Sequence, residues 1–116
     1  MKRFYGSDRL DPAKPLFDVT LLGLGPDGHT ASLIPGQPVL DERDKWAAAV
    51  TAGRPEARLT LTYPVLDSSK MVAFLVAGAG KKDILARAVA GDAALPAAGV
   101  KPLGDLVWFT DKAAAP

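Results

Sequence analysis

Apolar residues along the chain gather in short runs that stop at glycine, and this pattern predicts buried strands. One run extends from Phe17 to Leu22 before Gly23, and a longer one extends from Met71 to Ala77 before Gly78. Length, β-branched content and the glycine stop favour strands over helices. The second run is apolar on both faces, as a central parallel strand would be.

Three weaker segments are also predicted as strands. Residues 58–62 alternate apolar and polar side chains, the period of a half-exposed strand. Residues 47–51 form a short strand in this interpretation, although their alanines also suit a helix. A last strand is expected over residues 106–109.

Helices are predicted between the strands. Residues 82–90 have amphipathic spacing that places four apolar residues on one side, namely Ile84, Leu85, Ala88 and Val89. Single helical turns are predicted over residues 29–34 and 65–69. Asp111 with Thr110 is expected to cap a terminal turn.

Alternating strands and helices indicate an α/β fold with a mostly parallel, Rossmann-like sheet flanked by helices. Residues 1–16 are polar, contain two prolines and are predicted to be a lead-in or linker. Residues 17–116 are predicted to form a single α/β domain. Ligands of such sheets bind beyond the carboxyl ends of the strands, which selects the loops Leu24–Thr30 and Gly78–Lys82.

Composition narrows the function classes. The chain has 116 residues, 48% hydrophobic content, a net charge of +1 and no cysteine. Near-neutral charge argues against nucleic acid or an anionic membrane as a partner, and the lack of cysteine excludes disulfides and thiolate metal sites. No window approaches the ~20 apolar residues of a membrane span, and the start does not resemble a signal peptide. We therefore expect a cytoplasmic protein.

The loop after the first predicted strand holds the only histidine, His29, two residues after Asp27. A free-base imidazole is able to take a proton from water as the water attacks a carbonyl. Asp27 is suited to orient the ring if the backbone bends, and Gly25 and Gly28 permit that bend. The alternative is a histidine on a surface turn that has no chemical role.

Residues 23–28 also match the dinucleotide pattern G-x-G-x-x-G after a strand. The match is weak because Pro35 cuts the following helical segment short and Asp27 would repel a pyrophosphate.

Two cations are candidates for binding an anion. Lys81 lies where a predicted strand joins a helix start, and free backbone N–H groups attract anions at such a position. Arg58 opens another strand and carries a planar guanidinium that suits phosphate. The alternatives are an ordinary strand–helix turn with a solvated lysine and a surface arginine.

Four stretches resemble, in order, the 6-phosphogluconolactonase family, which lies in the glucosamine-6-phosphate isomerase/deaminase-like superfamily. The first is the signature loop, residues 21–36, LLGLGPDGHTASLIPG. The others are RLTLT (58–62), FLVAGAGK (74–81) and LVWFTDKAA (106–114). Glucosamine-6-phosphate deaminases share Asp-Gly-His, but their motif continues with a glutamate, whereas Ser32 to Pro35 contains no acid here.

The resemblance implies hydrolysis of 6-phospho-D-glucono-1,5-lactone to 6-phosphogluconate in the pentose phosphate pathway, without a metal or organic cofactor. It implies that His29 is the base that activates water and that Asp27 is the aspartate beside it. Arg58 and Lys81, with the loop glycines Gly25 and Gly28, are implied to bind the phosphorylated substrate.

The likeness covers only the carboxyl-terminal half of a family member, so we expect an incomplete NagB/RpiA-like fold. The isolated chain is then expected to have weak or no activity, and part of its sheet is expected to expose an edge and an apolar face. The missing amino-terminal half, or self-association through that edge, would supply the cover. The alternatives are a non-catalytic sugar-phosphate-binding fragment and a glucosamine-6-phosphate deaminase-like enzyme.

Overall fold

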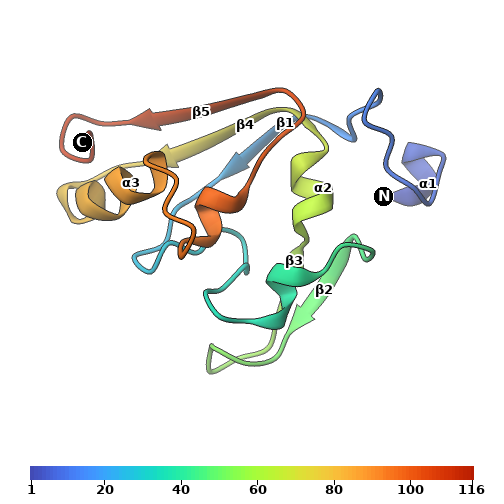
Figure 1. Cartoon of the computed structure of the whole chain (residues 1–116), viewed down its shortest axis with the longest axis horizontal. Coiled ribbons are helices and arrows are strands. Elements are labelled where there is room, and N and C mark those ends of the chain that lie inside the picture. Colours follow the sequence, from blue (N-terminus) through green and yellow to red (C-terminus); the bar gives the residue numbers. More distant parts are fainter.

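The computed structural model describes residues 1–116 and is built around a three-stranded parallel sheet in the order β1-β4-β5 (Figure 1). Its strands are β1 (Phe17–Leu22), β4 (Ser69–Val76) and β5 (Asp105–Thr110). Central β4 pairs in parallel with both neighbours, with Val72 opposite Thr20 on one side and Leu106 on the other. The predicted α/β class and the central position of the longest apolar run are confirmed.

A separate antiparallel hairpin joins β2 (Ala47–Val50) and β3 (Arg58–Leu61). Its burial reverses the usual alternation, because Leu59 is 82% exposed while Thr60 is buried. The Thr60 hydroxyl is satisfied inside, since its Oγ1 accepts a hydrogen bond from the Ser32 backbone N at 3.1 Å and donates to the Leu61 carbonyl at 2.9 Å.

The helices are α1 (Lys2–Tyr5), α2 (Tyr63–Asp67) and α3 (Lys82–Val89), with single 3-10 turns at Pro38–Asp41, Ala79–Lys81 and Pro96–Gly99. In α3 the predicted apolar side is confirmed for Ile84, Leu85 and Ala88, which are buried. Val89 was wrongly placed with them, because it is the last helical residue and its side chain is 52% exposed.

The helical turn predicted over residues 29–34 is wrong. Ala31 has a left-handed φ of 51°, which a right-handed helix does not admit. The segment instead makes a tight turn in which the Leu33 N–H donates to the Thr30 carbonyl at 2.9 Å. The Thr30 hydroxyl donates to the Gly23 carbonyl at 2.8 Å, so the turn folds back onto the end of β1.

The core lies on one face of the sheet. Val72, Phe74 and Val76 alternate along β4 and are at most 4% exposed, and Phe74 stacks on Trp108 of β5 with ring centroids 4.1 Å apart. In Figure 1 helices α2 and α3 and the hairpin all lie below the sheet, on the side of this core.

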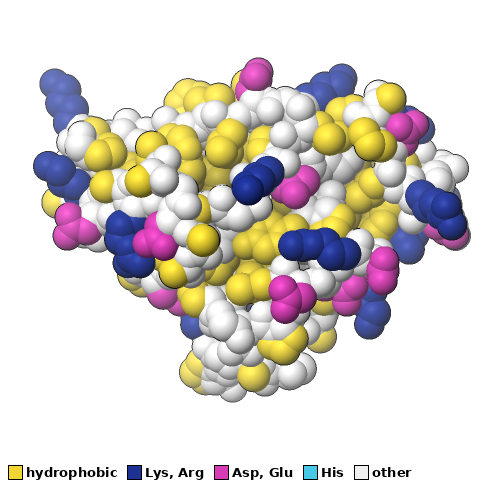
Figure 2. Space-filling model, viewed as in Figure 1, with side chains coloured by type: hydrophobic (Ala, Val, Ile, Leu, Met, Phe, Trp, Pro, Cys, Tyr) yellow, Lys and Arg dark blue, Asp and Glu magenta, His cyan; other side chains and the backbone are white.

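The opposite face of the sheet is bare. We call the four large apolar residues on it, each 53–64% exposed, the open face: Val19, Leu21, Leu75 and Phe109. Figure 2 shows hydrophobic side chains at the surface along the upper rim of the view, over β5. Parallel sheets are normally covered on both faces, and the predicted exposure of an apolar face is confirmed.

The segment 1–16, predicted to be a lead-in or linker, folds back onto the hairpin. Tyr5 is buried and meets Trp46 edge-on with ring centroids 5.7 Å apart. Its hydroxyl donates to the Lys14 carbonyl at 2.6 Å and accepts from the Asp11 N–H at 2.8 Å, which closes the segment into a loop. Across the structure, none of the helices has the length and apolar character needed to cross a membrane, and the cytoplasmic location stays a prediction.

Candidate active site

The two loops selected from the sequence meet at one edge of the sheet. Strands β1 and β4 are parallel, so the loop after Leu22 and the loop after Val76 leave from the same side. A direct contact joins the loops, because Lys81 Nζ donates a hydrogen bond to the Leu24 carbonyl at 2.5 Å. Lys81 is thereby fixed beside the histidine loop.

Asp27 and His29 form a hydrogen-bonded pair in this loop. Asp27 Oδ1 lies 2.5 Å from His29 Nδ1 and also accepts the His29 backbone N–H at 3.1 Å. The second bond is a local turn between a side chain and the backbone two residues on, which brings the two side chains together. Both side chains are partly open to solvent, at 39% exposure for Asp27 and 29% for His29.

Two glycines make the loop possible. A Cβ atom on Gly25 would lie 2.0 Å from His29 Nδ1 and Cε1, so the imidazole occupies the space that any other residue would fill. Gly28 has a φ of 84°, and a Cβ there would also press on Leu95 at 2.6 Å. Their N–H groups donate within the loop, from Gly25 to the His29 carbonyl and from Gly28 to the Gly25 carbonyl. In the structure, Gly25 and Gly28 therefore determine the shape of the loop.

Sequence reasoning missed Arg54, which completes the cluster from the loop between β2 and β3. Its Nη2 atom lies 2.9 Å from Asp27 Oδ2 and 3.2 Å from His29 Nδ1. Its Nη1 atom donates to the Gly53 carbonyl at 2.8 Å. The segment around Arg54 has no periodicity and lies 27 positions from Asp27 along the chain, so no local pattern marks the contact.

The surroundings of Asp27 favour its ionised form. Partial burial is the largest single influence and raises its pKa, but the hydrogen bonds from His29 and Arg54 together outweigh it. The net effect holds the pKa of Asp27 well below its usual value. At neutral pH the loop therefore presents a carboxylate that only accepts hydrogen bonds.

His29 borders two hollows. One, of about 190 Å³, is lined by His29, Ala31, Ser32, Ile34, Arg54 and Arg58. The other, of about 430 Å³, includes His29, Ala31 and Lys81 together with residues of the loop after β1. Arg58 and Lys81 thus do not line one common hollow, although each lies in a hollow that includes His29. The structure records no hydrogen bond or ion pair for the Arg58 side chain, which leaves its guanidinium free.

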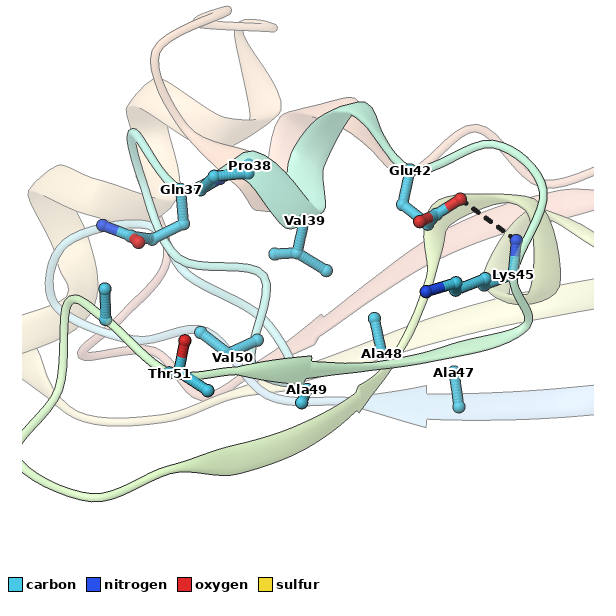
Figure 3. Close-up of a pocket in the computed structure, with 11 residues that line it drawn as sticks. Gln37, Pro38, Val39, Glu42, Lys45, Ala47, Ala48, Ala49, Val50 and Thr51 are labelled. Atoms are coloured by element: carbon cyan, nitrogen blue, oxygen red, sulfur yellow. Dashed lines mark hydrogen bonds between the residues drawn. The ribbon is translucent and has the colours of Figure 1, made fainter.

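Larger hollows lie away from this cluster. One of about 470 Å³ runs between the Pro38–Asp41 turn and β2, where Figure 3 shows Val39 and Ala48 facing its interior and the Glu42 carboxylate accepting the Lys45 N–H. Four of its eleven lining residues are alanines, and none is a histidine. A second, of about 500 Å³, lies at Tyr63, Asp67 and Arg43, where burial raises the pKa of Tyr63 to about 12. Neither hollow contains a histidine, so the His29 loop is the better candidate for a base that acts near neutral pH.

The structure contains no group of three or more histidine, cysteine or acidic side chains suited to hold a metal ion. The Asp27–His29 pair has the form of a general base held by a carboxylate. Cations on both sides of such a base suit an anionic substrate that reacts with water.

Comparisons with known proteins agree with this interpretation. A family model described as glucosamine-6-phosphate isomerases/6-phosphogluconolactonase matches residues 2–108. The 6-phosphogluconolactonase of Rattus norvegicus is 49% identical over 105 residues, which are 87% of this chain and 41% of that protein.

Solved structures show the same likeness. The crystal structure of 6-phosphogluconolactonase from Thermotoga maritima has a TM-score of 0.69 and 34% identity, and the match covers 82% of this chain and 43% of that one. The crystal structure of devB protein has a TM-score of 0.79 and 33% identity, with 91% and 46% covered. The chain thus spans about two fifths of the length of the curated relative described above and less than half of these solved chains.

Proposed function

Because the chain belongs to the glucosamine-6-phosphate isomerase/6-phosphogluconolactonase family, we propose that its His29 loop serves the hydrolysis of 6-phospho-D-glucono-1,5-lactone to 6-phosphogluconate. The observation that carries the proposal is the Asp27–His29 pair, with Arg58 and Lys81 in the two hollows that include the imidazole. The chain spans only part of its relatives, so the activity of the isolated chain is expected to be weak or absent.

In the proposed reaction His29 acts as the general base. Asp27 accepts a hydrogen bond from the Nδ1–H group, which leaves the lone pair on Nε2 to receive a proton from water. The hydroxide oxygen bonds to the lactone carbonyl carbon, and Asp27 stabilises the imidazolium. Collapse of the tetrahedral intermediate breaks the bond to the ring oxygen, which takes the proton back and becomes the hydroxyl of the open acid.

Arg58 and Lys81 supply the positive charge for the 6-phosphate of the substrate. The free guanidinium of Arg58 suits bidentate binding of phosphate oxygens. Lys81 keeps two further N–H donors beyond the one that it gives to the Leu24 carbonyl. Gly25 and Gly28 contribute by shaping the loop.

We test substrate binding with 6-phosphogluconate, the stable product. Calorimetric titration of the chain is expected to show saturable binding that Arg58→Ala and Lys81→Ala each weaken about 10-fold or more, since each removes a charged hydrogen-bond donor. Arg43→Ala is the matched control, because Arg43 lies over the Tyr63 ring, in the hollow of about 500 Å³ away from His29. Equal binding by parent and both site variants would refute these phosphate roles.

The sheet lacks the cover that parallel sheets normally have on this open face. A second candidate function is therefore that of a fragment that binds sugar phosphates without turnover. Binding of 6-phosphogluconate with no hydrolysis of the lactone by this chain supports that candidate, whereas hydrolysis supports the enzyme. Release of ammonia from glucosamine 6-phosphate would instead indicate a deaminase.

We further propose that additional polypeptide covers the open face in the active protein. The relatives that share this sheet are more than twice as long as their matched segments, and the open face consists of residues of the kind that parallel sheets bury. The covering polypeptide is then expected to be an apolar segment that packs on β1, β4 and β5.

A further inference from the structure

Arg54 is held on both sides of its guanidinium. One end donates to the Gly53 carbonyl at 2.8 Å, and the other donates to Asp27 Oδ2 at 2.9 Å. Its side chain is 27% exposed, less than the Asp27 carboxylate that it contacts. The contact joins the loop before β3 to the loop after β1, which have no other ion pair between them.

The positions of the hydrogen atoms follow from the acceptors. Ionised Asp27 is unable to donate, so the 2.5 Å contact of its Oδ1 with His29 Nδ1 requires the hydrogen to be on Nδ1. Arg54 Nη2 is also a donor, and its 3.2 Å approach to Nδ1 therefore joins two donors. This approach is an electrostatic contact between a fixed positive charge and the ring, and it does not add a hydrogen bond.

Such a charge opposes protonation of the imidazole. Asp27 favours a positive ring, but Arg54 shares that carboxylate and brings its own positive charge within contact distance. The other charged groups that face His29 across its two hollows, Arg58 and Lys81, are also cations. Only Asp27 stabilises the imidazolium, and Arg54 limits how far it does so.

We infer that Arg54 is a positioning residue that holds the Asp27 carboxylate against His29 and places a fixed positive charge beside the ring, with the Nε2 lone pair available. The inference rests on the proposed function for its purpose, since a neutral imidazole is the form that accepts a proton from water. Its structural content, the position of the Arg54 charge beside Asp27 and His29, does not depend on catalysis.

Two variants distinguish an effect of the Arg54 charge on His29 from a role in which Arg54 only links the two loops. A lysine at this position keeps the charge but lacks the planar fork that reaches Gly53 and Asp27 together. A neutral glutamine removes the charge while keeping a polar side chain. The charge effect and the tying effect therefore respond differently to Arg54→Lys and Arg54→Gln.

The test is an NMR titration of the imidazole in the whole chain without substrate. His29 is the only histidine, so its ring signals need no assignment. In Arg54→Gln we expect the midpoint of His29 protonation to move to higher pH by about 0.5–1 pH unit, the size expected when one partly exposed charge within contact distance is removed. Arg54→Lys is expected to move it less, and Nδ1 is expected to carry the hydrogen of the neutral ring in the parent.

Arg58→Gln is the matched control, because Arg58 lines the same hollow but makes no bond to Asp27. Its midpoint is expected to move by less than half the shift of Arg54→Gln. An unchanged or lower midpoint in Arg54→Gln, or an Nε2-protonated neutral ring in the parent, would overturn the inference. If Arg54→Gln fails to fold, Arg54→Ala, which also removes the charge, decides, and a midpoint equal to the parent's in that variant counts against the inference. A chain that shows these shifts but binds no 6-phosphogluconate would leave this inference standing while the proposed function fails.

Discussion

At the scale of single residues, the site depends on the absence of a side chain at Gly25. The imidazole of His29 lies where a side chain at this position would be, only 2.0 Å from the place of a Cβ. No neighbour in the structure approaches the corresponding place at Gly23, two residues earlier in the same loop. The two glycines therefore have different roles although both stand in the signature loop.

This difference gives a paired prediction. In Gly25→Ala the new methyl group forces the imidazole away from Asp27, and we expect loss of the Asp27–His29 hydrogen bond and about a 100-fold loss of any lactonase turnover, because small displacements of a catalytic group are costly. Gly23→Ala is expected to change neither. The His29 ring signals report the hydrogen bond, and unchanged ring signals in Gly25→Ala would contradict the geometry.

At the scale of elements, the sequence predicted best where burial alone decides the structure. Strand β4 is apolar from Met71 to Val76 and is the central strand, and α3 is amphipathic because it lies on the core face of the sheet. Both follow from side-chain hydrophobicity in a short window. The loops after β1 and β4 could also be selected in advance, because parallel strands deliver their carboxyl ends to one edge.

Prediction failed where distant partners decide the structure. The segment 29–34, predicted as a helical turn, folds as a tight turn in which the Ser32 N–H donates to the Thr60 hydroxyl of β3 and Ala31 takes a left-handed conformation. Arg54 shows the same limit, because its role depends on Asp27, which is remote in the sequence and adjacent in the fold. Local patterns carry no signal for contacts of this kind.

At the scale of the whole molecule, the open face dominates the behaviour that we expect of the isolated chain. Its four exposed residues form an apolar surface on β1, β4 and β5 with no element packed over it. Exposed apolar patches on sheets promote association. The chain without additional polypeptide is therefore expected to self-associate in a concentration-dependent way.

Sedimentation velocity or light scattering over a range of concentrations measures this association. The double variant Leu21→Lys, Phe109→Lys places charges on the open face and is expected to be largely monomeric where the parent associates. Leu59→Lys is the control, because Leu59 is 82% exposed on the separate hairpin, and it is expected to behave as the parent does. A parent chain that stays monomeric at all concentrations would argue against a face in need of cover.

The central claim is that His29 is the base of a lactonase, and a chimera tests it most directly. This chain would replace the matching segment of the rat relative, to which it is 49% identical over 105 residues, so that the remainder of that protein completes the fold. The measurement is the rate of 6-phospho-D-glucono-1,5-lactone hydrolysis after subtraction of the spontaneous rate. We predict turnover by the chimera and a loss of about 10²–10⁴-fold in His29→Asn, with 6-phosphogluconate binding nearly unchanged. Equal turnover by the chimera and its His29→Asn variant would contradict the account.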